Sequence, residues 1–291
     1  MSVFEKGGQP FDQASLARHI EEALAVEAPR GLKVELFSRL VKSIFQPQFI
    51  DADKIPPRPC LFVANHSLFA LDGVVLLPML LSELGLFVRS LGDRFLWTAK
   101  TESLLLASGA VLGHPEVCSA LMAAGKDILV FPGGAHEALK PKSQQYTLQW
   151  KERYGFVKMA AEYGYTIMPM ALVGPEEFYD HIIEGEDILH SRFADLLRRL
   201  GIITEKTRTD VVPPLPRGSL CTLLPKPQRC YFQLGDPIDM APYAGKKLTK
   251  RQLQSIRGKT ARQIETMLVG LQALRDQERH SEGWLRRLLT V

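Results

Sequence analysis

Apolar side chains recur at helical spacing in the first fifty residues of the chain. Residues 13–26 and 32–45 each place them on one face, and the second segment has a polar, mainly basic opposite face. Pro29 and Gly31 separate the two patterns, because both residue types interrupt helices. We therefore expect residues 1–50 to form an amphipathic helical hairpin, which either caps the core or contacts a membrane surface.

Short apolar runs and helical patterns then alternate along the chain. Strands are expected at residues 60–64, 85–91, 109–112, 127–131, 166–173 and 231–234. Helices are expected at residues 74–84, 103–107, 115–124 and 155–163, with a long one at 249–279. The alternation predicts an α/β fold, with a mixed, mostly parallel sheet flanked by helices. We expect one α/β domain over residues 51–245, a basic helix and tail over 246–291, and a long surface loop at 204–227.

The composition is ordinary for a globular fold, with 46% hydrophobic and 23% charged residues. The most apolar stretch, residues 73–88, is interrupted by Pro78 and Glu83 and falls short of the roughly 20 residues that a spanning helix needs. The start of the chain lacks the pattern of a signal peptide, and the four cysteines lack CxxC spacing. We therefore expect reduced thiols and a cytosolic setting.

The net charge of +4 is unevenly distributed, because residues 245–291 hold eleven Lys or Arg and four Asp or Glu. Such a tail favours an anionic partner, either a membrane surface or nucleic acid, although a solvated helix face has the same composition. Residues 283–289 mix a Trp, leucines and paired arginines, as interfacial segments do.

A histidine stands where a predicted strand gives way to a helix. The apolar residues 62–64 lead into Asn65-His66-Ser67, and Asp72 follows. A histidine can act as a base at neutral pH, and a carboxylate bonded to its far ring nitrogen fixes the tautomer and stabilises the imidazolium. His66 and Asp72 are therefore candidates for a catalytic pair. The alternative is a strand-end histidine beside an acid that the helix dipole favours.

A glycine turn follows the strand at 127–131. Gly133 and Gly134 allow close approach of the backbone to a ligand, and the N–H groups of such a turn can hold an anion or a developing oxyanion. The cations that follow either receive phosphates of a coenzyme or are solvated: Lys140, Lys142, Lys151 and Arg153.

Together with a Gly-Phe helix at 155–163 and a Met-Pro strand at 166–173, these segments resemble the glycerolipid acyltransferase superfamily. Its pattern is Asn-His, four residues and Asp, then Phe-Pro-Glu-Gly, then a Gly-Phe helix and a Val-Pro strand. Variants of all three occur here in order between residues 59 and 178, with a weaker Gly-Asp-Pro-Ile element at 235–238.

The details are most similar to the type 2 diacylglycerol and monoacylglycerol acyltransferase branch. The phosphate-using members carry Glu in place of Gly133, and a Gly-x-x-x-x-Arg segment there helps to hold the acceptor phosphate. The matching stretch here, residues 109–114, ends in His114 instead of Arg. The lost cation fits an acceptor that lacks phosphate.

The resemblance implies an acyl-CoA-dependent O-acyltransferase, with His66 as the base and Asp72 as the residue that orients it. It implies a lipid acceptor, a peripheral position on the cytoplasmic face of a membrane, acyl-CoA as co-substrate, and neither cofactor, metal nor nucleic acid. The residues expected to contact substrates are Asn65, Ser67, His114, Phe131, Pro132, Gly133, Gly134, His136, Glu137 and Lys140.

One feature departs from the superfamily pattern. Five residues, rather than four, separate His66 from Asp72. A loop before a helix absorbs an insertion easily, so we expect Asp72 to reach His66, with Glu137 and Glu102 as the alternative acids.

Two other functions remain open at this stage. One is acylation of lysophosphatidate or glycerol 3-phosphate, and the other is lipid binding without catalysis. A serine hydrolase is disfavoured because the chain has no Gly-x-Ser-x-Gly motif. The sequence does not decide between acyl-CoA and acyl carrier protein as the donor.

Overall fold

The computed structural model describes residues 12–98, 101–184 and 214–290. Its strands are β1 (Gln48–Ile50), β2 (Cys60–Ala64), β3 (Arg89–Gly92), β4 (Ala110–Leu112), β5 (Ile128–Val130), β6 (Thr166–Val173), β7 (Asp180–Ile183), β8 (Leu215–Arg217) and β9 (Tyr231–Leu234). Its α-helices are α1 (Gln13–Ala25), α2 (Leu32–Phe45), α3 (Leu71–Leu84), α4 (Glu102–Ala107), α5 (Pro115–Ala123), α6 (Gly134–Ala138), α7 (Gly155–Tyr163), α10 (Lys250–Glu278) and α11 (Trp284–Leu289).

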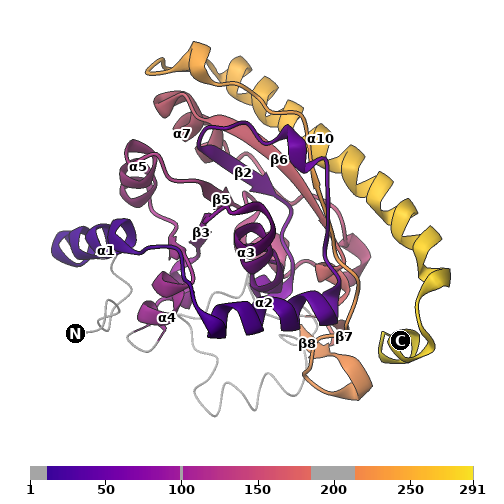
Figure 1. The fold of residues 1–291 in the computed structure, drawn as a ribbon. Helices are drawn as coiled ribbons and strands as arrows, with labels where there is room; N and C mark the ends of the chain where they lie inside the picture. The colour runs from indigo at the N-terminus through magenta and orange to yellow at the C-terminus, as the bar shows by residue number, and fades with distance from the viewer. Residues whose placement is uncertain (1–11, 99–100, 185–213, 291) are drawn as a thin grey trace, which may run out of the picture.

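A seven-stranded sheet lies at the centre of the fold, in the order β1-β9-β6-β2-β5-β3-β4, and helices cover both of its faces (Figure 1). All neighbouring strands in it are parallel except β6 and β9. The predicted α/β class, with a mixed, mostly parallel sheet and N-terminal helices, is confirmed. The short antiparallel pair of β7 and β8 was not predicted.

The central strand β2 is buried along its whole length because β5 and β6 flank it and helices cover it on both sides. Its side chains alternate between two cores, as the pleat requires. Leu61 and Val63 join the core formed with α1, α4, α5, α7 and α10, whereas Cys60, Phe62 and Ala64 join the core formed with α2 and α3.

The two N-terminal helices lie on opposite faces of the sheet, so the expected hairpin is wrong. Leu16 and Ala23 of α1 pack into the first core near α5, and Val41 and Phe45 of α2 pack into the second near α3. Each helix has its own apolar face to bury, and the non-helical linker at 26–31 lets them separate.

A proline lies inside the fully buried strand β6. Pro169 has no N–H to donate, yet it stands in register with Val63 of β2. Its carbonyl accepts from the N–H of Gly235, one residue beyond the end of β9. Pro169 therefore lies opposite a residue just beyond the end of β9, where the hydrogen-bond ladder between β6 and β9 no longer needs an N–H donor. This explains why β6 tolerates the proline.

Several boundaries differ from the prediction. Helix α3 begins at Leu71 rather than at residue 74, and β1, α6 and α11 were not predicted. Of the expected loop at 204–227, residues up to 213 lie outside the described part of the chain, and the rest contains β8. Within the described residues, no helix is both long enough and apolar enough to cross a membrane.

Candidate active site

Three adjacent parallel strands, β5, β2 and β6, bring their carboxyl ends to the same edge of the sheet. Open α/β sheets bind ligands at this edge. Strand β2 is followed by Asn65 and His66, β5 by the glycine turn, and β6 by Gly174 and Glu176. The candidate residues that lie far apart in the sequence therefore meet here.

The extra residue does not prevent His66 from reaching Asp72. Nδ1 of His66 lies 2.7 Å from Oδ2 of Asp72, a distance suited to donation from the ring N–H to the carboxylate. The same Oδ2 accepts from the N–H of Ser67 at 2.7 Å, and Oγ of Ser67 accepts from the N–H of Asp72 at 3.2 Å. Ser67 therefore holds Asp72 in place, and both residues are buried.

Two consecutive left-handed residues accommodate the insertion. Phe69 has φ 58° and Ala70 has φ 55°. Residues other than glycine rarely adopt this left-handed backbone region. This turn allows α3 to begin at Leu71, so that Asp72 lies in its first turn, where the helix dipole favours a negative charge. The insertion is thus absorbed at a small cost in backbone strain.

The imidazole of His66 is enclosed on one face and at one end. The ring of Phe131 stacks on it, with centroids 4.1 Å apart and planes 12° apart. Burial opposes the charged form of His66, but the charge and hydrogen bond of Asp72, together with the charge of Glu137, raise the pKa of His66 above its ordinary value. No described residue hydrogen-bonds Nε2 of His66, and its side chain is 12% exposed. Nε2 is therefore the ring nitrogen left for a ligand.

Glu137 supports His66 through the backbone. Its Oε1 accepts from the N–H of His66 at 2.8 Å, and its Oε2 accepts from the N–H of Gln149 at 3.0 Å. Because its carboxylate bonds to main chain and not to the ring of His66, Glu137 is not the alternative acid. Burial raises the pKa of Glu137 against the opposing charge of Lys140.

The glycine at position 133 is required by this carboxylate. A Cβ built on Gly133 would lie 2.1 Å from Oε2 of Glu137 and 2.3 Å from its Cβ. The side chain of Glu137 thus fills the space that the glutamate of the superfamily pattern would need. Arg153 fastens the same turn, since its Nη1 donates to the carbonyls of Pro132 and Gly133 at 2.9 Å.

Only part of the turn can donate to a ligand. The N–H of Gly134 donates to the carbonyl of Phe131 at 2.9 Å, so the expected contact between this N–H and an oxyanion is corrected. The N–H of Gly133 makes no hydrogen bond with a described residue. Gly133 is therefore the remaining donor of the pair.

Beneath His66 lies a buried polar layer centred on Glu176. Its carboxylate accepts from Nζ of Lys140 at 2.9 Å, from Nδ2 of Asn65 at 3.1 Å and from the N–H of Tyr146 at 2.8 Å. The amide of Asn65 also exchanges two hydrogen bonds with the backbone of Leu172, which extends the pairing of β2 with β6. The expected substrate contacts of Asn65 and Lys140 are therefore corrected, because both side chains are buried and bonded within the protein.

The remaining predicted residues lie farther out. His114 caps α5 by accepting from the N–H of Glu116 at 3.3 Å, and it follows the edge strand β4, three strand spacings or roughly 14 Å from β2. Glu102 lies 3.6 Å from His19 and 3.5 Å from Arg18, so it is not the partner of His66. His136 on α6 lies 2.8 Å from Nζ of Lys151 at the exposed rim.

Glu176 and Tyr146 are the parts of the site that the sequence did not reveal. The available signal was an acid shortly after the buried strand β6, three residues beyond its end, much as His66 follows two residues beyond the end of β2. Burial raises the pKa of Glu176, and the charge of Lys140 opposes this effect.

A family model described as diacylglycerol acyltransferase matches residues 55–265. Phytyl ester synthase 2, chloroplastic, of Arabidopsis thaliana is 24% identical over 261 residues, which cover 80% of this chain and 36% of that protein. Phytyl ester synthase 1, chloroplastic, of the same plant is 27% identical over 196 residues, which cover 62% of this chain and 28% of that one.

One further relative and one solved structure are also similar to this chain. The acyl-CoA wax alcohol acyltransferase 1 of Mus musculus is 34% identical over 76 residues, covering 26% of this chain and 23% of that protein. Among solved structures, the 1-acyl-sn-glycerophosphate acyltransferase PlsC from Thermotoga maritima covers 86% of this chain and 87% of its own, with a TM-score of 0.45 and 12% identity. The chain spans about a third of the length of the phytyl ester synthases it matches. Since the family model covers most of the sequence, the chain belongs to the diacylglycerol acyltransferase family.

Proposed function

We propose that this chain is an acyl-CoA-dependent O-acyltransferase that esterifies the hydroxyl of a neutral lipid acceptor. The observation that carries the proposal is the pairing of His66 with Asp72 at the end of the central strand, with Nε2 free to meet a hydroxyl. This is the arrangement in which a carboxylate fixes the tautomer of a catalytic base.

In the proposed reaction, Nε2 of His66 takes the proton of the acceptor hydroxyl as its oxygen attacks the thioester carbonyl carbon. The negative charge of Asp72 stabilises the imidazolium, and the N–H of Gly133 donates to the oxyanion of the tetrahedral intermediate. The carbon–sulfur bond then breaks, and the thiolate leaves with the proton from His66. The products are an ester and the free thiol of coenzyme A.

A neutral acceptor fits the cations near the turn better than a phosphate does. Lys140 is paired with Glu176, Lys142 with Asp180, and Arg153 with two carbonyls of the turn. These cations are already used within the protein, so they are poorly placed to bind an acceptor phosphate. The names of two relatives include phytyl ester and wax alcohol, which supports a long-chain alcohol or a diacylglycerol as acceptor.

For the donor, Lys151 is an exposed cation beside the turn, and it is bonded to the ring of His136 rather than to a carboxylate. Arg257 of α10 donates to the carbonyl of Lys151. This bond joins the loop to the N-terminal half of α10, which is strongly basic. We assign the phosphates of coenzyme A to this rim. We also propose a peripheral position on the cytoplasmic face of a membrane, where a lipid acceptor is dissolved.

The proposal is tested by offering the purified chain a labelled acyl-CoA and a panel of acceptors. The panel holds a long-chain alcohol, diacylglycerol, monoacylglycerol, lysophosphatidate and glycerol 3-phosphate, and an acyl carrier protein donor is run in parallel. We expect labelled neutral ester with release of coenzyme A. Faster acylation of lysophosphatidate or glycerol 3-phosphate would replace the acceptor assignment, and lipid binding without release of coenzyme A would replace catalysis altogether.

A further inference from the structure

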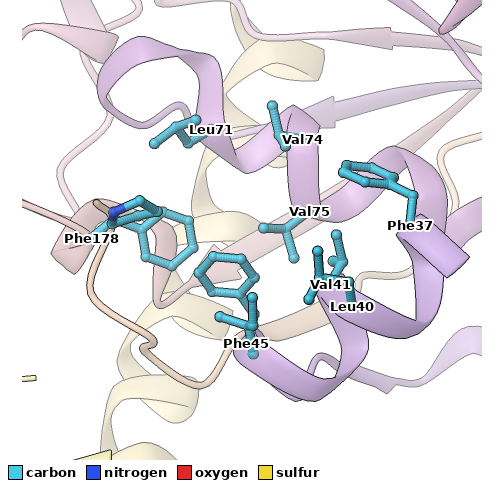
Figure 2. A pocket seen from close by; sticks show the side chains of 10 residues that line it. Phe37, Leu40, Val41, Phe45, Leu71, Val74, Val75 and Phe178 are labelled. Carbon is cyan, nitrogen blue, oxygen red and sulfur yellow. The ribbon is translucent and has the colours of Figure 1, made fainter. Parts of the chain in front are cut away.

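A groove with an entirely apolar lining lies between α2 and α3, and its volume is about 140 Å³. Figure 2 shows Phe37, Val41 and Phe45 on the α2 side, with Leu71 and Val75 on the α3 side. Leu71, which lines the groove, directly precedes Asp72 in the chain.

The apolar face of helix α2 is wide, and a stripe of exposed residues continues its buried stripe. Leu36, Phe37 and Leu40 are 53%, 46% and 55% exposed, although the buried stripe of the same helix already supplies Val41 and Phe45 to the core. An amphipathic helix needs only the buried part of such a face for packing, so the exposed stripe exceeds what the core requires.

Two other exposed apolar segments join this stripe through hydrogen bonds. Nη1 of Arg286 in α11 donates to the carbonyl of Ile44 at the end of α2, at 2.9 Å, and to that of Pro227. Oγ of Ser219 donates to the carbonyl of Leu289 at 3.1 Å, which ties the segment 219–224 to α11. In Figure 1, α2 and the C-terminal end lie along the lower side of the molecule.

We propose that these three segments form one docking face for an anionic lipid bilayer, around the mouth of the groove. The docking face comprises Leu36, Phe37 and Leu40 of α2, Leu220, Leu223 and Leu224 of the segment 219–224, and Trp284, Leu285 and Leu288 of α11. Apolar surface of this kind, gathered from distant parts of a chain, marks an interaction site.

The charge around the docking face identifies a bilayer as its partner. Residues 30–46, 214–229 and 283–290 together hold nine Lys or Arg and a single acid, Glu35, and four of the nine cations pair with Glu83, Asp180 or Glu278. Arg30, Lys33, Arg39 and Arg287 are exposed and form no ion pair with a described residue. Leucines and a tryptophan beside unpaired cations suit the boundary between acyl chains and anionic headgroups.

This inference deepens the proposed function and rests on it in one respect: the bilayer then holds the lipid acceptor that His66 acylates. It also corrects the expected N-terminal anchor, since α1 packs on the other face of the sheet and takes no part. The C-terminal segment and α2, expected as two anchors, form a single surface.

The test is flotation of the full chain with vesicles of phosphatidylcholine, alone or mixed with phosphatidylglycerol. Three variants each remove one segment's contribution: Leu36→Ser, whose side chain does not line the groove, Leu220→Ser with Leu223→Ser, and Trp284→Ser with Leu288→Ser. The matched control is Val269→Ser on α10, which removes an apolar side chain that is 68% exposed on the opposite layer. All side chains changed are exposed, and thermal unfolding verifies that each variant folds.

We expect each of the three variants to bind mixed vesicles at least about tenfold more weakly, because large apolar side chains no longer leave water. The control should bind as the unchanged chain does, and Lys33→Glu with Arg39→Glu should remove the preference for phosphatidylglycerol. Unchanged flotation of folded variants overturns the proposal. A change from dimer to monomer in light scattering, with flotation intact, also overturns it and makes the face an interface between copies.

Acyl transfer separates this proposal from the function on which it rests. The variants should lose transfer to an acceptor held in vesicles but keep transfer to a short-chain alcohol in solution. If the unchanged chain transfers no acyl group to any acceptor while flotation still depends on the docking face, the proposed function fails and the docking face stands.

Discussion

The His66 site and the docking face are neighbours in the fold, but they are built in opposite ways. Around His66, the carboxylates of Asp72, Glu137 and Glu176 are buried and each accepts at least two hydrogen bonds from the protein. On the docking face, large apolar side chains are more than two-fifths exposed, and side-chain hydrogen bonds from Ser219 and Arg286 join its segments.

The difference shows which constraints act on each region. A buried carboxylate is tolerated only when its oxygens are paired, so the site is fixed atom by atom and its residue types are restricted. Exposed apolar side chains have no such requirement, and many combinations of Leu, Phe and Trp would serve equally well. Substitutions at the site should therefore lower acyl transfer whether the acceptor is in detergent or in a bilayer. Substitutions on the docking face should lower it only when the acceptor lies in a bilayer.

The largest effect is expected for Asp72→Asn. The pKa of His66 is raised by Asp72 against the effect of burial, so the variant should lose both the tautomer control and the stabilised imidazolium. We expect acyl transfer to fall about a thousandfold or more, equally in vesicles and in detergent. A loss confined to vesicles would break the contrast between the two regions.

The pH dependence of the same variant sharpens this test. In the unchanged chain, transfer should decline as the pH falls through the raised pKa of His66, so the acid limb of the rate profile lies above the reference value of 6.5. In the Asp72→Asn variant, the acid limb of the rate profile should move to lower pH. The stabilisation that the charged His66 gains from Asp72 is fully present below about pH 6.5 and disappears as the pH rises through the folded-state pKa. The difference in unfolding free energy between the two chains should follow that course.

The next effect concerns stability. Lys140→Met leaves the buried carboxylate of Glu176 without its cation. We expect the free energy of unfolding, measured in urea, to fall by about 3–5 kcal/mol. Lys142→Met is the matched control, because the Nζ of Lys142 pairs with Asp180 at a side chain that is 51% exposed. Its cost should stay below about 1 kcal/mol. Equal costs for the two variants would contradict the buried polar layer.

Much of this polar layer was invisible in the sequence for a physical reason. The ordered motifs predicted the sheet, the pairing of His66 with Asp72 and the glycine turn, because each is local or lies at a strand end. Asn65 and Glu176 are 111 positions apart, and their contact depends on the parallel register of β2 with β6. The separation of α1 from α2 was missed for a similar reason, since an amphipathic pattern shows that a face is buried but not against which element.

A smaller effect is expected at the glycine turn. Gly133 has ordinary helical dihedral angles, so Gly133→Ala is limited only by the clash with Glu137. We expect a loss of about 1–3 kcal/mol in stability and a fall in activity, because the carboxylate must leave the N–H of His66. Gly155→Ala is the control, since no atom lies within 4 Å of its added Cβ, and this variant should be neutral or slightly stabilised. Similar behaviour of the two variants would show that Glu137 does not occupy this space.

The smallest effect tests the inserted residue. Ala70 is held at φ 55°, so Ala70→Gly should relieve strain and raise the free energy of unfolding by up to about 1 kcal/mol. The same substitution at the exposed helical position Ala273 should lower it by about 1 kcal/mol. Opposite signs in thermal melts support the left-handed turn, whereas losses in both variants would contradict it.

The central claim is that His66 is the base of an acyl transfer. It is tested most directly by the yield of labelled ester from His66→Ala, with a long-chain alcohol presented in detergent so that the docking face is bypassed. The account predicts a folded variant with less than about a thousandth of the original rate. A folded His66→Ala protein that retains more than about a tenth of that rate would contradict it.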